Sequence, residues 1–162
     1  MRHGDAGKRL PAGGKDSERA LTMTGQEEVE FVADGLSSIG IKIDLVATSP
    51  LKRSLQTAQI VATTLKLKKG KVEQWNELKP EGNSAELYRK LSQFKQESSV
   101  LVVGHEPNLS NMTSNIVFGT TAGGIVLKKA GVAKINITSL QPKAKGELRW
   151  LLTPSQLKKL SK

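Results

Sequence analysis

Apolar residues between positions 29 and 39 recur at every third or fourth place, which is the spacing of one helix face. Thr24 precedes this run and Glu27 lies three residues further on, a capping-box pattern that predicts the start of the helix. Gly40 predicts its end. Upstream of this helix, residues 5–19 are rich in glycine, proline and mixed charges, which predicts a loop.

Short apolar runs predict strands between the helices. Residues 43–48 and 99–104 are the clearest, because they are rich in branched side chains and short. Ser49 and Pro50 follow the first run and predict the N-cap and first residue of a helix that ends near Leu65. The same signals predict strands at 72–75, 125–128, 132–138 and 147–152, and helices that begin at Asn83, near Pro107 and at Thr153.

Strands that alternate with helices predict an α/β fold with three αβα layers and a mostly parallel sheet. The last strands predict antiparallel additions near the C-terminus. The length of 162 residues fits a single domain over 1–162. In such sheets ligands bind beyond the carboxyl ends of the strands, which is where Ser49, Arg53 and His105 fall.

Composition narrows the chemistry. The chain has no cysteine, which excludes disulfides, thiolate metal sites and cysteine nucleophiles. The net charge is +10, but residues 107–162 carry 9 basic residues against Glu147 alone, so the excess is uneven. Dispersed lysines are typical of a solvated face, and 4% aromatic residues leave little to stack on bases, so we expect no nucleic-acid partner.

No apolar stretch approaches the roughly 18 residues that span a bilayer, and the first residues do not resemble a secretory signal. We therefore expect a cytoplasmic protein with no membrane partner, and a monomer.

Both histidines of the chain lie in motifs. Arg2-His3-Gly4-Asp5, the segment from Ser49 to Ala58, and Gly104-His105 together resemble the histidine phosphatase superfamily, which has the phosphoglycerate mutase-like fold. The resemblance spans most of the chain. Three further segments narrow it to the SixA-type phosphohistidine phosphatases: Arg19 to Thr22 with Gly25, the turn at 78–82, and residues 150–154.

This resemblance implies roles for five residues. His3 would be the nucleophile and form a covalent phosphohistidine that water then hydrolyses. Arg2 and Arg53 would clamp the phosphoryl oxygens, and His105 would donate a hydrogen bond to the charge that develops there. Arg19 matches a family position suited to binding substrate or phosphate.

A general acid for the leaving group is harder to assign. Glu81 lies in the region where mutase relatives carry a glutamate, as does Glu77, and Glu106 follows His105 where acid phosphatases of the superfamily carry an aspartate. Glu81 and Glu106 are therefore the candidates. The lack of an obvious acid favours phosphohistidine over phosphate monoesters, because a leaving imidazole can be protonated from solvent.

We expect no metal and no cofactor, because two histidines without cysteine make a poor zinc site and residues 13–16 lack the pattern of a nucleotide-binding loop. The expected substrate is a histidine-phosphorylated protein or a small phosphorylated molecule. Two alternatives stay open: a small phosphomonoesterase of the same superfamily, and a non-catalytic phosphate-binding regulatory module.

One departure from the family concerns the first strand. Relatives run an apolar central strand into Arg-His-Gly, whereas Met1 alone precedes Arg2 here. Loss of several buried side chains, at about 1.5 to 3 kcal/mol each, would unfold the protein or leave His3 unanchored. We therefore expect Met1 to be an internal methionine, with about five upstream residues that encode the strand.

Overall fold

The computed structural model describes residues 1–8 and 14–161, so part of the predicted loop at 5–19 lies outside the described residues. The helices are α1 (Met23–Ser38), α2 (Lys52–Thr64), α3 (Ser84–Leu91), α4 (Asn108–Phe118) and α5 (Pro154–Leu160), with short 3-10 turns at Asp16–Glu18 and Asn76–Leu78. The strands are β1 (Leu45–Thr48), β2 (Val72–Gln74), β3 (Val100–Val103), β4 (Val132–Ser139) and β5 (Lys145–Leu152).

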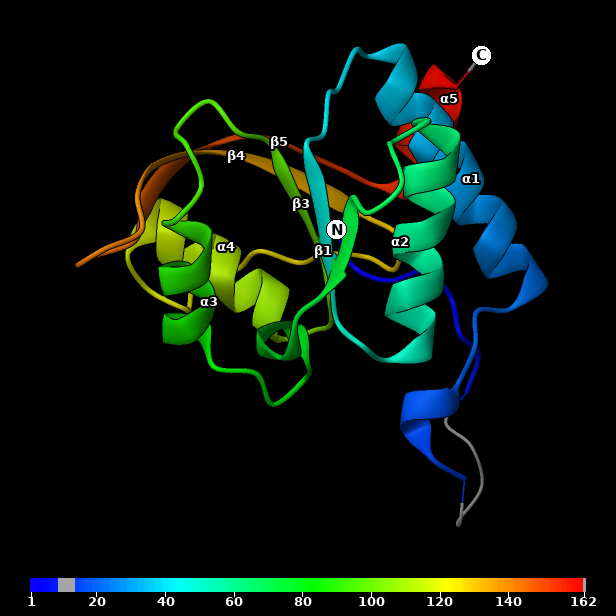
Figure 1. Ribbon diagram of the computed structural model, residues 1–162, viewed down its shortest axis with the longest axis horizontal. Helices are drawn as coiled ribbons and strands as arrows, with labels where there is room; N and C mark the ends of the chain where they lie inside the picture. The colour runs from blue at the N-terminus through cyan, green and yellow to red at the C-terminus, as the bar shows by residue number, and fades with distance from the viewer. Residues whose placement is uncertain (9–13, 162) are drawn as a thin grey trace.

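The strands form two separate groups. β2, β1 and β3 make a parallel sheet in that order, with Val46 opposite Leu101 in the β1–β3 pairing. β4 and β5 pair antiparallel as a hairpin. In Figure 1, α1, α2 and α5 lie to the right of β1 and β3, and α3 and α4 lie to the left. The α/β class, the parallel sheet and the antiparallel C-terminal strands are therefore confirmed.

The side chains of the parallel sheet alternate between two cores, as strand geometry requires. Val46 and Val103 are fully buried in the core that α1, α2 and α5 cover. Leu45 and Ala47 point the other way and pack with Trp75 near α3. These two cores on opposite faces give the three layers that the sequence predicts.

Two predicted helix starts are wrong in position. Helix α1 begins two residues early, because Thr22 rather than Thr24 accepts the hydrogen bond from the amide of Gly25, at 3.0 Å. Helix α2 begins at Lys52, two residues after Pro50. The N-cap of α2 is Leu51 rather than Ser49, and the Ser49 hydroxyl contacts His105.

The predicted strand at 125–128 is also wrong, because this segment is a connection without strand pairing. Leu127 is buried, but its amide donates to Ser110 Oγ at 3.4 Å and its carbonyl accepts from Arg2 at 3.0 Å. Side chains thus replace a neighbouring strand. By contrast, Asn83 caps α3 and Thr153 forms a capping box at α5, as predicted.

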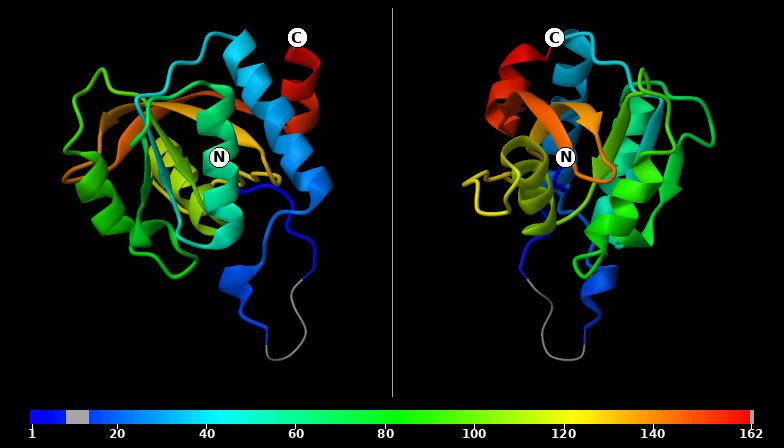
Figure 2. Two further views of the ribbon diagram at one scale, coloured as in Figure 1. Left: turned by 45° about the vertical axis from the view of Figure 1, so that its right-hand side comes forward. Right: turned by 90° about the vertical axis from the view of Figure 1, so that its left-hand side faces the viewer.

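The first three residues run through the middle of the molecule, where both views in Figure 2 place the N-terminus. Met1 is only 4% exposed. Arg2 forms an isolated parallel bridge with Gly104 just beyond β3, and the amide of Ala130 donates to the carbonyl of His3 at 3.0 Å. His3 is therefore anchored from both sides, although loss of the preceding strand was expected to unfold the protein or leave His3 unanchored.

Candidate active site

The site forms where three segments meet at the carboxyl end of the parallel sheet. His3 follows the buried N-terminal segment, Arg53 is in the first turn of α2, and His105 follows β3 directly. The two imidazole rings lie 5.0 Å apart between centroids, although 102 residues separate them in sequence. All three side chains are buried, with at most 7% of the residue exposed.

The hydrogen bonds of His3 fix which of its nitrogens carries the lone pair. Nδ1 lies 2.7 Å from the carbonyl oxygen of Gly4, which can only accept, so Nδ1 carries the proton. Nε2 is then unprotonated, and it accepts from Nε of Arg53 at 3.3 Å. The Nε2 electron pair thus points towards the guanidinium group of Arg53.

Gly4 holds the chain after His3 close to α1. A Cβ at this position would lie 2.7 Å from a methyl group of Val29, so no larger residue fits without a shift. The Gly4 amide donates to Thr57 Oγ1 at 3.1 Å, and the same hydroxyl donates to the carbonyl of Arg53 at 2.7 Å. Thr57 therefore links the backbone beside His3 to the turn of α2 that carries Arg53.

His105 is held by two serine hydroxyls. Its Nε2 lies 2.8 Å from Ser49 Oγ and 3.3 Å from Ser54 Oγ, and both serines are fully buried. Its Nδ1 faces a terminal nitrogen of Arg53 at 3.4 Å, which can only donate. Because serine hydroxyls donate as well as accept, both tautomers of His105 fit the two serines. In the tautomer with the proton on Nδ1, the ring can donate towards the site.

Both imidazoles are held neutral. The pKa of His3 is lowered to about 4, chiefly by burial and also by the charges of Arg53 and Arg2, although the hydrogen bond to Gly4 acts in the opposite direction. The pKa of His105 is lowered to about 3, chiefly by burial and also by the neighbouring His3 and Arg53. His3 is thus neutral at neutral pH, with Nε2 unprotonated, as a nucleophile requires.

Asp16 was not predicted, yet it contacts the site directly. Arg53 donates to the Asp16 carbonyl at 2.8 Å and forms an ion pair with its carboxylate at 3.0 Å. Arg19 binds the same carboxylate at 3.0 Å and also donates to the carbonyl of Gly7 at 2.9 Å. Burial would raise the pKa of Asp16, but the two guanidinium groups bring it below its usual value. The Asp16 carboxylate therefore connects Arg19 to Arg53.

Arg2 has an unsatisfied donor. One terminal nitrogen donates to the Leu127 carbonyl at 3.0 Å, but its buried Nε has no hydrogen-bond partner within the described part of the chain. A buried N–H without an acceptor is costly, and an anion would satisfy it. The charge of Arg2 also lowers the pKa of both imidazoles, so its guanidinium acts on the same site.

The two candidate acids make no hydrogen bond to either imidazole among the described residues. Glu81 is exposed, and neither it nor Glu106 hydrogen-bonds to His3 or His105 among residues 1–8 and 14–161. One carboxylate oxygen of Glu106 is buried without a partner in these ranges, and its charge acts on the Met1 ammonium. Among the described residues, no three His, Cys, Asp or Glu side chains gather as a metal-binding group, and no helix is long and apolar enough to cross a membrane.

Two neutral imidazoles beside the guanidinium groups of Arg2, Arg19 and Arg53 form a cationic site that could hold an anion, and comparisons with known proteins identify the family. Residues 1–82 match the model of the histidine phosphatase superfamily (branch 1). An uncharacterized protein of Picosynechococcus sp. is 31% identical over 161 residues, which cover 97% of this chain and 96% of that protein. The chain belongs to the histidine phosphatase superfamily, and it is accordingly a phosphatase.

Solved structures support the same family. The protein histidine phosphatase SixA, complexed with tungstate, matches with a TM-score of 0.84 and 28% identity over 97% of this chain and 96% of that one. A phosphoglycerate mutase of Bacillus anthracis matches with a TM-score of 0.66 over 99% of this chain and 94% of that one, but at 14% identity this shows the fold alone. The predicted phosphoglycerate mutase-like fold and the SixA-like resemblance are confirmed.

Proposed function

We propose that this chain is a phosphohistidine phosphatase that removes phosphate from a histidine of another protein through a covalent intermediate on His3. The observation that carries the proposal is the orientation of His3. Gly4 holds the Nδ1 proton, so the electron pair of Nε2 faces Arg53 and the second imidazole. This is the arrangement that an in-line attack on phosphorus needs.

In the first step, the Nε2 electron pair of His3 forms a bond to phosphorus, and the bond from phosphorus to the substrate imidazole breaks. The substrate nitrogen keeps that electron pair and takes a proton. In the second step, water attacks phosphorus, loses a proton, and releases inorganic phosphate, while Nε2 recovers its electron pair. Arg53 and Arg2 bind the phosphoryl oxygens, and His105 donates from Nδ1 to the charge in the transition state.

Two observations favour phosphohistidine over a phosphate monoester. SixA, whose solved structure this chain resembles, is a protein histidine phosphatase. In addition, the one carboxylate that contacts the site within the described ranges, that of Asp16, is held ionised by two arginines and is a poor proton donor. An alkoxide leaving group needs such a donor more than an imidazole does.

The test is phosphate release from a phosphohistidine peptide and from an aryl phosphate monoester, measured for the wild type and for His3→Ala. We expect turnover of the phosphohistidine peptide at a higher kcat/KM, and loss of both activities in the variant. Acid-labile phosphate trapped on the wild type and absent from the variant would identify the intermediate. Unchanged turnover in His3→Ala would contradict the mechanism, and phosphate binding without turnover would favour a regulatory module.

A further inference from the structure

The carboxylate of Asp5 joins three segments beside the active site. Its Oδ1 accepts from the amide of Gly7 at 3.3 Å and forms an ion pair with Lys129. Its Oδ2 lies 3.3 Å from the hydroxyl of Thr22, the N-cap of α1. The pKa of Asp5 lies below its ordinary value, chiefly because of the hydrogen bond from Lys129. An ionised Asp5 thus holds the chain after His3 both to α1 and to a residue 124 positions further along the sequence.

The contact with Gly7 folds residues 5–7 into a tight turn that faces Arg19. Gly7 has a φ of +65°, in the left-handed region that favours glycine. A short carboxylate that accepts from the amide two residues further on stabilises such a turn. The carbonyl of Gly7 accepts from Arg19 Nη1 at 2.9 Å, and the carbonyl of Ala6 lies 3.4 Å from the same nitrogen. The position of the Arg19 guanidinium therefore depends on the turn that Asp5 closes.

The first turn of α1 packs closely against the backbone of Asp5. The amide of Thr22 donates to the Asp5 carbonyl at 2.9 Å. A Cβ at Gly25 would lie 2.2 Å from the same carbonyl oxygen, so the helix reaches this position only because residue 25 has no side chain. The backbone of Asp5 is thus fixed by the helix, which leaves its carboxylate in place for Lys129.

Lys129 lies between two residues that hold the segment of the nucleophile. The carbonyl of Leu127 accepts from the Arg2 guanidinium at 3.0 Å, and the amide of Ala130 donates to the His3 carbonyl at 3.0 Å. The ion pair of Lys129 therefore connects the part of the chain that holds Arg2 to the turn described above.

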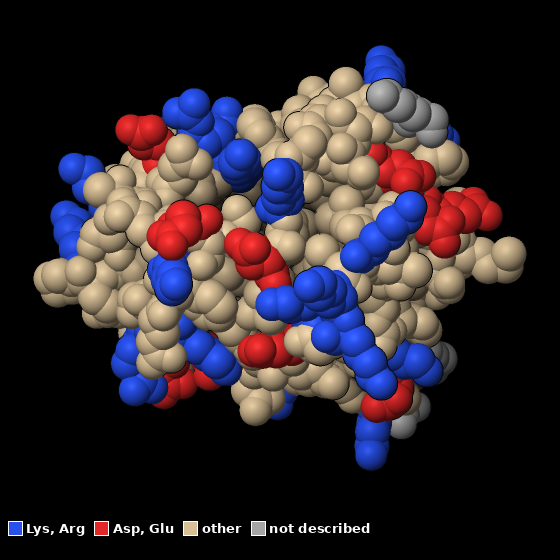
Figure 3. All heavy atoms as spheres, turned by 45° about the horizontal axis from the view of Figure 1, so that its top comes forward, with Lys and Arg blue, Asp and Glu red and all other residues tan. Residues whose placement is uncertain are grey.

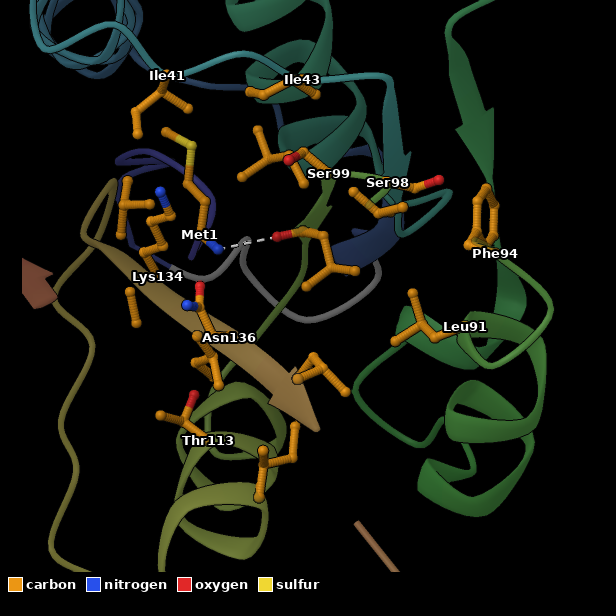
Figure 4. Close-up of a pocket in the computed structure, with 18 of the residues that line it drawn as sticks. Met1, Ile41, Ile43, Leu91, Phe94, Ser98, Ser99, Thr113, Lys134 and Asn136 are labelled. Atoms are coloured by element: carbon orange, nitrogen blue, oxygen red, sulfur yellow. Dashed lines mark hydrogen bonds between the residues drawn. The ribbon is translucent and has the colours of Figure 1, made fainter. Parts of the chain in front are cut away.

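The chain before His3 is held in a different way, by apolar packing. Figure 4 shows the Met1 side chain pointing toward Ile41 at one end of a groove that Lys134 also lines. Met1 is buried in the core that α1 covers. The polar contacts of Asp5 are thus specific to the chain that follows the nucleophile.

Stability alone does not account for the pair of Asp5 and Lys129. Acidic and basic side chains are interspersed over the face that Figure 3 shows, so contact between two of them is not by itself a sign of function. The side chains of Asp5 and Lys129 are 38% and 41% exposed, and ion pairs this exposed contribute little to stability. The pair is set apart by what it connects, the guanidinium groups of Arg2 and Arg19.

We propose that Asp5 and Lys129 are positioning residues of the active site, and that their ion pair fixes Arg19 and Arg2 at the separation at which both bind one phosphoryl group. The proposal rests on the proposed function, because it takes the phosphoryl group on His3 as the ligand. Asp5 acts through Arg19, and Lys129 acts through Asp5.

Positioning and simple electrostatics predict opposite effects for Asp5. Loss of a negative charge beside an anion site by itself tightens anion binding. A displaced Arg19 weakens it instead, because a charge-assisted hydrogen bond to the anion is lost. The sign of the change therefore distinguishes the two.

The experiment measures the Kd of inorganic phosphate by NMR titration at fixed pH and ionic strength. We expect Asp5→Asn to raise the Kd by roughly 3- to 10-fold. Glu28→Gln is the matched control and should leave the Kd within about twofold. Burial raises the pKa of Glu28, the charge of Asp5 adds to this and that of Lys129 opposes it, so Glu28 lies close to the same pair. A lower Kd in Asp5→Asn, or an equal rise in Glu28→Gln, would overturn the proposal.

Double variants separate positioning from a structural role. Asp5→Asn should have no further effect on the Kd in an Arg19→Ala background, and Lys129→Met should raise the Kd in the wild type but not in an Asp5→Asn background. Thermal unfolding should stay within about 3 °C of the wild type for the single variants of Asp5 and Lys129, because the pair is exposed. The same rise of the Kd in both backgrounds would show a structural role and overturn the proposal. Because the Kd is measured without turnover, a lack of activity on a phosphohistidine peptide would contradict the proposed function and leave this result intact.

Discussion

Arg53 binds both the backbone carbonyl and the carboxylate of Asp16, while the Nε of the same guanidinium donates to Nε2 of His3. The carboxylate therefore uses a donor that a phosphoryl group on His3 would need. Arg19 holds the same carboxylate from the other side. Asp16 is placed as an internal competitor for the anion.

Removal of this charge should tighten phosphate binding. We expect Asp16→Asn to lower the inhibition constant of inorganic phosphate and the KM of the substrate by roughly 3- to 10-fold, because a like charge beside the anion is removed. Inhibition kinetics at fixed ionic strength measure it. Asp34→Asn, which removes an exposed carboxylate on α1, is the matched control and should leave both constants unchanged. A rise of KM in Asp16→Asn would mean that Asp16 mainly orients Arg53.

Arg53 should not tolerate lysine. An ammonium group cannot donate to His3, a phosphoryl oxygen and Asp16 with the fixed geometry of a guanidinium. We expect Arg53→Lys to reduce kcat/KM by about 10² to 10³, the usual cost of one donor to a transition-state charge. Arg149→Lys, at an exposed ion pair with Glu147, serves as the control and should be neutral. Activity within twofold of wild type in Arg53→Lys would exclude the clamp.

Ser49 should act only through His105. Its hydroxyl lies 2.8 Å from His105 Nε2, and loss of a buried hydrogen bond costs about 1 to 3 kcal/mol. We expect Ser49→Ala to lower kcat by roughly 10-fold in the wild type, and to have no further effect in a His105→Ala background. The readout is a double-mutant cycle on kcat. The same factor in both backgrounds would show that Ser49 supports the site by another route.

The acid limb of kcat/KM should lie near pH 4. This profile reports the free enzyme, in which burial and the neighbouring arginines lower the pKa of His3 to about 4 from 6.5. His3 thus stays nucleophilic well below the pH at which an exposed histidine is protonated. NMR titration of the His3 ring is the direct check once the titration of the substrate phosphate is corrected for. A midpoint near 6.5 would contradict the buried, neutral imidazole.

Stability should depend on pH through the same two rings. Below pH 6.5 the unfolded chain binds protons on both imidazoles, whereas the folded protein binds them only near pH 4 for His3 and pH 3 for His105. The free energy of unfolding therefore decreases as pH falls from 6.5 to 4. Urea denaturation over this range measures it. His3→Asn should show a shallower decrease, and an identical slope would indicate that His3 is not desolvated.

Periodicity predicts the scaffold of this protein well, because buried faces require regular spacing of apolar residues. The runs at 43–48 and 99–104 form β1 and β3. The positions at which these runs end correctly predict Arg53 and His105 at the carboxyl end of the parallel strands. The four residues that the family motifs single out, His3, Arg2, Arg53 and His105, lie together in the structure. Their catalytic roles remain predictions.

Contacts made by single polar side chains could not be predicted in the same way. Asp16 lies in a loop without any periodic pattern, so nothing in the sequence links it to Arg53. Ser49 carries the signal of a helix cap, but α2 begins at Lys52, and the Ser49 hydroxyl contacts His105 as well as the amide of Leu51. Residues 125–128 have the composition of a strand, but the backbone of Leu127 bonds to the side chains of Ser110 and Arg2. Composition alone gives no sign of these partners.

Within the described ranges β3 has β1 as its one strand partner and β4 has β5, and this bears on how the protein behaves in concentrated solution. Unpaired strand edges act as templates on which other chains add strands, and β3 offers four apolar residues in a row. The outer edge of each strand is therefore a place where two molecules could pair edge to edge at high protein concentration.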